Sequence, residues 1–145
     1  MASFAYTYAL GLLNSTVLTG DIRALLVMSN TTADTDEDAE FITGGITTLD
    51  EYDGAAYARV ALTGEAFAVD TANDRFEFDA NAFTFSTLGV GTRQCVGLVL
   101  YLHVTNDADS KPLFYFDGTG FPFDGNGADV TFTPNTELVH VQNAP

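Results

Sequence analysis

Short apolar and alternating runs, each ended by Gly, Asn, Asp or Pro, limit what this chain can fold into. Such runs are too short for most helices and have the length and punctuation of β-strands. Eight of them follow one another without a repeat of 20 to 50 residues. The sequence therefore predicts an all-β fold, a two-sheet antiparallel sandwich of jelly-roll type. The eight expected strands lie at 21–29, 55–64, 75–80, 82–86, 94–104, 113–117, 129–133 and 137–141.

Two of these runs are apolar on both faces, which is typical of strands covered on both sides. They are "DIRALLVMS" at 21–29 and "QCVGLVLYLHV" at 94–104, and we expect them at the centres of their sheets. In contrast, "RFEFDA" at 75–80 alternates cleanly, so Phe76 and Phe78 are expected to face inward on a half-exposed strand.

The N-terminal stretch "SFAYTYALGLLNS" departs from the strand pattern. Phe4, Tyr8 and Leu12 recur at four-residue spacing, which predicts a short amphipathic helix. We therefore divide the chain into an N-terminal amphipathic segment, 1–16, and a β-sandwich domain, 17–145. The helix either closes one end of the sandwich or forms an arm that docks on a neighbouring subunit. In the second case Phe4, Tyr8 and Leu12 are the protein-interface residues.

Charge limits the partners of the protein. Five basic residues against twenty acidic ones give a net charge of −15 in 145 residues. Nucleic acids and anionic membranes attract Lys and Arg, so we expect neither as a partner. The N-terminus has no basic flank and no long apolar stretch, and we expect neither a signal peptide nor a membrane span. The single cysteine, Cys95, lies in an apolar run and is expected as a buried thiol.

The densest acidic run, "DTDEDAE" at 34–40, places carboxylates on alternate positions as a calcium loop does. A calcium loop also needs a glycine at its sixth position and a glutamate at its twelfth. Counting from Asp34, these positions hold Ala39 and Gly45; counting from Asp36, they hold Phe41 and Thr47. We therefore expect a hydrated, freely moving exterior loop and no metal site.

No pattern of catalytic residues is evident. The two histidines, His103 and His140, lie in apolar strand-like runs outside any nucleophile motif. A zinc site needs three or four Cys or His ligands, and the three in this sequence have no standard spacing. The composition does not exclude the paired carboxylates of a glycosidase. However, the acidic residues cluster in turns, and the sequence has no Trp to stack on a sugar. We expect no catalytic residue, no cofactor and no enzyme activity.

The order of several segments resembles small structural proteins of tailed-bacteriophage virions. These segments are "YALGLLN", "DIRALLVMSNTTADTDED", the "DEYDG" box at Asp50 to Gly54 with "AAYAR" after it, "FDANAFTFSTLGVGT", and "LYLHVTNDADSKPLFYFDGTGFPFDGNGADVTFT". The resemblance covers nearly the whole chain. The strongly acidic balance and the scarcity of Lys depart from the pattern of the group.

The resemblance implies a virion component, most simply a capsid decoration or cement protein made in the cytoplasm of the host bacterium and placed on the capsid exterior. Its partner would be the major capsid protein, whose subunits it bridges, and copies would form a homo-oligomeric ring or cluster on the virion. A net charge of −15 favours the outside of the shell over the neighbourhood of packaged DNA. A tail or baseplate component and a carbohydrate-binding sandwich are the alternatives.

Overall fold

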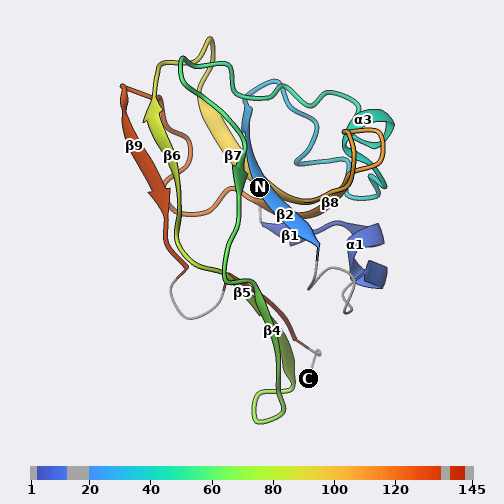
Figure 1. Ribbon diagram of the computed structural model, residues 1–145. Coiled ribbons are helices and arrows are strands. Elements are labelled where there is room, and N and C mark those ends of the chain that lie inside the picture. Colours follow the sequence, from blue (N-terminus) through green and yellow to red (C-terminus); the bar gives the residue numbers. More distant parts are fainter. Residues whose placement is uncertain (1–2, 13–19, 135–137, 143–145) are drawn as a thin grey trace.

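The chain forms antiparallel β-sheets with little helix, as a computed structural model shows (Figure 1). The structure describes residues 3–12, 20–134 and 138–142. The expected all-β class and antiparallel pairing are confirmed. The two helical segments are α1 (Thr7–Leu12) and α3 (Ile42–Gly45), and the strands are β1 (Phe4–Ala5), β2 (Asp21–Met28), β3 (Val60–Ala61), β4 (Ala66–Asp70), β5 (Arg75–Asp79), β6 (Phe83–Leu88), β7 (Cys95–His103), β8 (Lys111–Phe116), β9 (Ala128–Phe132) and β10 (Val139–Gln142).

The largest sheet has five strands in the order β1-β8-β7-β2-β3. Its centre is the pair β2 and β7, which run side by side from Asp21↔His103 to Met28↔Cys95. Almost every side chain of both strands is buried, so the sheet is covered on both faces. The prediction that the two longest apolar runs form central strands is confirmed.

The remaining described strands pair in two smaller sheets, β10-β5-β4 and β6-β9. In Figure 1 the β6–β9 ribbon lies on one side of the main sheet, and α1 and α3 lie on the other. The β4–β5 hairpin projects from the lower end of the body together with β10. The described strands thus form three sheets, of five, three and two strands, whereas the sequence predicts two sheets.

Two differences from the expected strands have a physical cause. The run at 55–64 supplies only the two residues of β3, because Tyr57 turns across the edge of β2 and accepts a hydrogen bond from Leu26 N at 3.1 Å. Strand β4 was not expected from the sequence. Its alternating Phe67 and Val69 are flanked by Ala and Asp, which weakens the strand pattern.

Candidate functional site

The N-terminal residues predicted as an interface do not form one helical stripe. Phe4 lies in strand β1, where it pairs with Tyr115 of β8, and its ring stacks on the Tyr115 ring with 5.4 Å between centroids. The helix begins only at Thr7, because the edge of β8 offers backbone partners that a helix would leave unused. The predicted helix is therefore correct over 7–12 and wrong at Phe4.

The other two predicted interface residues fall on or near α1. Tyr8 is 49% exposed, whereas its neighbours Tyr6 and Ala9 are buried in the core of the same chain. Leu12 ends the helix, and its side chain lies outside the described residues, as does the domain boundary expected between residues 16 and 17. The described part of the segment thus packs mainly on its own chain.

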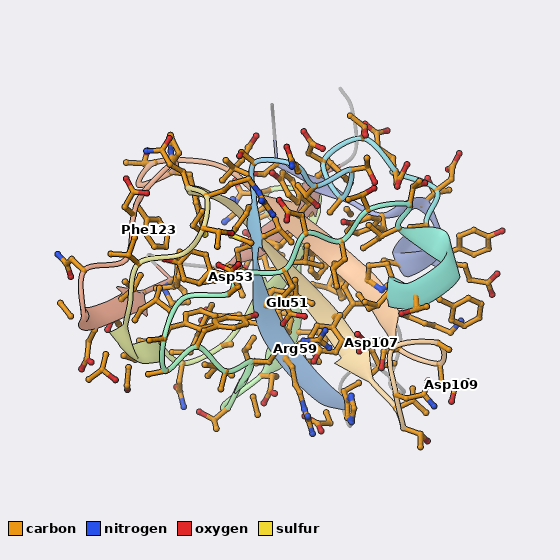
Figure 2. All side chains as sticks on the ribbon, turned by 90° about the horizontal axis from the view of Figure 1, so that it is seen from above. Glu51, Asp53, Arg59, Asp107, Asp109 and Phe123 are labelled. Atoms are coloured by element: carbon orange, nitrogen blue, oxygen red, sulfur yellow. The ribbon has the colours of Figure 1, made fainter. Side chains whose placement is uncertain are left out.

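The densest polar cluster surrounds Arg59, just before β3 (Figure 2). The guanidinium donates to both carboxylate oxygens of Glu51, at 2.7 and 2.6 Å, and to both of Asp107, at 2.6 and 2.7 Å. A fifth hydrogen bond reaches the hydroxyl of Tyr101 at 3.2 Å. An arginine has five N–H donors, and all five are used here.

Elements far apart in sequence bring this cluster together. Glu51 forms an isolated antiparallel bridge with Val27 of β2, Tyr101 lies on β7, and Asp107 lies in the turn after β7. Tyr57 adds a hydrogen bond to Glu51 at 2.7 Å. The hydrogen bond from Arg59 is the main cause that lowers the pKa of Asp107. The cluster is a closed charge network that clamps loops 50–59 and 104–110 onto the sheet edge.

The "DEYDG" box, residues 50–54, is a structural hub. The Tyr52 hydroxyl donates to Gly89 O at 2.8 Å and accepts from Gly91 N at 2.9 Å and Gly125 N at 3.1 Å. One phenol group therefore ties the turn after β6 to the loop before β9. A side chain on Gly125 would place its Cβ 2.1 Å from Gly89 O, so the close approach needs glycine.

The acidic residues of the box are also engaged. Asp50 pairs with Arg93 and accepts a hydrogen bond from Asn30 N at 2.8 Å. Asp53 accepts from Thr92 N at 2.8 Å and from Thr92 Oγ1 at 2.7 Å. These bonds lower the pKa of both carboxyls. The largest contribution at Asp50 comes from Arg93, and the largest at Asp53 comes from Thr92. With Glu51 bound to Arg59, every side chain of 50–53 is engaged, and Asp50, Tyr52 and Asp53 all hold the segment 89–93.

The acidic run at 34–40 is packed against the chain rather than free in solvent. Ala33 and Ala39 are buried, Tyr6 donates its hydroxyl hydrogen to Ala33 O at 2.8 Å, and Thr7 N donates to Glu37 O at 2.8 Å. The Asp36 carboxylate accepts from Thr32 Oγ1 at 2.7 Å and from Thr47 N at 2.6 Å. Our expectation that all these carboxylates are freely hydrated is wrong for Asp36. Among the described residues no group of three or more His, Cys, Asp or Glu side chains is arranged to hold a metal ion.

Replacing Asp36 by Ala is expected to lower the free energy of unfolding by about 1–2 kcal/mol, because two donors lose an ionised acceptor. The matched changes Asp34→Ala and Asp38→Ala should stay within about 0.5 kcal/mol, as surface substitutions do. Urea denaturation followed by far-UV circular dichroism measures all three. Equal effects at Asp34 and Asp36 would show that the Asp36 contacts do not stabilise the loop.

Reactive side chains are held in structural roles. Ser110 is fully buried and donates its hydroxyl hydrogen to Asn106 O at 2.7 Å, so its 3.5 Å contact with His103 Nδ1 does not activate it as a nucleophile. Cys95 is a buried free thiol, as predicted, and burial raises its pKa to about 12. Such a thiol is unreactive at neutral pH. The side chain of His140 lies outside the described residues.

All five basic side chains of the sequence are bound to carboxylates of the same chain. Arg23 pairs with Asp21, Arg59 with Glu51 and Asp107, Arg75 with Asp70 and Glu77, Arg93 with Asp50, and Lys111 with Glu40. The acidic residues outnumber the basic ones, so the charges that remain beyond these ion pairs are negative. This distribution favours cationic partners and repels anionic ones.

Comparison of the chain with protein-family models, curated proteins and solved structures finds no match. In the part of the chain that the structure describes, no helix is both long and apolar enough to cross a bilayer.

Proposed function

We propose that this protein is a structural component of a tailed-phage virion, a capsid decoration protein that binds the outer capsid surface and bridges major capsid protein subunits. The observation that carries the proposal is the ordered succession of segments that resembles virion proteins, from "YALGLLN" to "DGNGADVTFT". Those segments include the 50–54 hub, the central strand β2 and the last four residues of β7. The resemblance therefore lies in residues that organise the fold.

The hydrogen bonding of the described polar side chains supports a binding role rather than catalysis. No described buried side-chain N or O atom lacks a hydrogen-bond partner, and the polar clusters around Arg59 and Tyr52 are closed on themselves. An active site usually keeps a reactive group available to a substrate. We propose that the protein is not an enzyme and acts without a cofactor, through protein contacts alone.

Charge supports a place on the exterior of the shell. A protein with a net charge of −15 is repelled by packaged DNA, whereas on the outer surface its charge disperses particles. We propose many copies per virion, arranged in rings or clusters, so that each copy adds an interface that must break before the shell opens. Production in the host cytoplasm is part of the same proposal.

We also propose a jelly-roll-like sandwich as the finer description of the fold. The support is that the β6–β9 ribbon buries Phe83, Phe85 and Leu88, whose side chains belong to the same core as those of the main sheet. The Tyr57 and Phe85 rings stack with centroids 6.0 Å apart, across the gap between the loop on β2 and β6. A crystal structure in which the β6–β9 ribbon does not pack against the main sheet would contradict this description.

The test is the number of copies in purified virions, measured by quantitative mass spectrometry against the major capsid protein. We expect a ratio of order one copy per few capsid subunits, which amounts to hundreds of copies. A handful of copies would instead identify a tail or baseplate component, and absence from particles would overturn the virion proposal. Specific binding on a glycan array would favour the carbohydrate-binding alternative.

A further inference from the structure

The β4–β5 hairpin is the most prominent projection of the molecule. It leaves the lower end of the body in Figure 1 and carries β10 on one side, while β4 forms the outer edge of this three-stranded sheet. Its two strands pair from Ala66↔Asp79 to Asp70↔Arg75, with the turn at 71–74 as its tip.

A row of aromatic rings runs from the core into the hairpin. Phe114 of β8 stacks on Phe78 with 5.9 Å between centroids, Phe78 lies 4.7 Å from Phe67, and Phe67 lies 5.1 Å from Phe76. Directly opposed strand residues share a face, so Phe67 and Phe78 lie on the same face as Val69 and Phe76. This row anchors the hairpin to the core and makes one of its faces apolar.

The apolar face is covered at its base and open at its tip. Phe78 is 1% exposed, whereas Val69 is 73% exposed, the highest value among the large exposed hydrophobic side chains of the described residues. Phe76, opposite Val69, is only half-buried. An apolar surface that continues out of the core and ends in solvent is typical of a protein-binding site.

Charge around the hairpin determines the chemistry of the occupant. Residues 65–79 contain five acidic residues and one arginine, a net charge of −4, and that arginine, Arg75, is paired with Asp70 and Glu77. A second copy of the chain would bring the same negative surface, and its five basic side chains are bound to its own carboxylates. Nucleic acids and anionic lipids are repelled as well.

We propose that the tip of the β4–β5 hairpin docks through Val69 and Phe76 onto an apolar patch that is bordered by Lys and Arg on a different protein. This inference deepens the proposed function, on which it rests, because the capsid subunit is then the protein that presents the cationic patch. The apolar contact supplies affinity at the centre of the interface. The Asp74 carboxylate in the tip turn, at the rim of this contact, orients the encounter.

The test uses the full-length protein and purified capsid shells that lack it, with binding measured by co-sedimentation over a range of concentrations. Val69→Asp is expected to weaken binding by about tenfold or more, because it places a charge in the apolar centre of the contact. Val104→Asp is the matched control, since Val104 is 55% exposed outside the hairpin, and it should change binding less than about twofold.

A second pair of measurements tests the charges. The Asp74→Asn variant should weaken binding at about 0.05 M NaCl and should do so much less at about 0.5 M, where ions screen the rim. Both Val69 and Asp74 are exposed, so unchanged circular dichroism is expected for every variant. A milder Val69→Ser change replaces Val69→Asp if the latter alters the fold.

The outcomes separate the two proposals. If the wild-type protein binds shells and Val69→Asp and Val69→Ser bind equally well, the hairpin inference is overturned while the virion proposal stands. If Val69→Asp instead abolishes association between copies of the chain in sedimentation velocity, the occupant is a second copy and the inference of a different, cationic partner fails. Failure of the wild-type protein to bind shells overturns the proposed function and the inference that rests on it.

Discussion

Replacing Arg59 by Met is expected to lower the free energy of unfolding by about 3 kcal/mol. Methionine keeps most of the aliphatic length but removes all five donors, so Glu51 and Asp107 are left facing each other without a cation. Removing one partner of a fully buried ion pair costs about 3–5 kcal/mol. The lower end applies because the side chains of Arg59, Glu51 and Asp107 are 20%, 26% and 31% exposed.

The matched control is Arg23→Met. Arg23 pairs with Asp21, at side-chain exposures of 35% and 43%, and a surface pair of this kind contributes about 0–1 kcal/mol. Adding Asp107→Asn to the Arg59→Met variant should restore part of the loss, because it removes one of the two opposed charges. Urea denaturation at pH 7 measures these variants. Equal losses in Arg59→Met and Arg23→Met would show that the cluster contributes no more than an ordinary surface pair.

The sequence predicted the parts of the fold whose local pattern and tertiary environment agree. The runs that contain β2 and β7 are apolar on both faces, and only a covered central strand satisfies such a run. Phe78 is buried as predicted and Phe76 on the same face is half-buried, because alternation in a strand determines which side chains share a face.

The parts that were not predicted depend on contacts between distant segments. A two-residue strand such as β1 has no period of its own, and its conformation is set by the edge of β8, more than a hundred residues away. The partners of Arg59 lie 8 and 48 residues from it, so no spacing in the sequence indicates the cluster. The same holds for Asp36, whose backbone partner Thr47 is 11 residues away.

The candidate interface shows the same limit. The four-residue spacing of Phe4, Tyr8 and Leu12 is a valid helical signal, but the chain uses Phe4 in a strand and buries Tyr6 instead. The exposed apolar tip of the hairpin has a weaker signal, the alternation of Phe67 and Val69 followed by the turn "TAND". That signal indicates a strand and not whether its apolar face is covered, which only the packed structure determines.

Substitution of Gly125 by Ala is expected to lower the free energy of unfolding by about 3 kcal/mol or more, at the upper end of the cost of overpacking. The added Cβ would lie 2.1 Å from Gly89 O and 2.6 Å from the Tyr52 hydroxyl, and the first of these is a backbone atom that cannot rotate away. Relief requires the loop before β9 to move, which breaks the 3.1 Å bond from Gly125 N to Tyr52. Clash and lost hydrogen bond therefore act together.

Gly118→Ala is the matched control for this change. A Cβ on Gly118 would meet no atom within 4 Å, and this residue does not have the positive φ that restricts substitution of Gly120. The free energy of unfolding of the Gly118→Ala variant should therefore change by no more than about 0.5 kcal/mol, and the reduced entropy of its unfolded chain acts in the stabilising direction. Thermal and urea denaturation of both variants measure the difference. A Gly125→Ala protein as stable as Gly118→Ala would mean that the loops can separate freely, and Tyr52 would then not be the hub that holds them together.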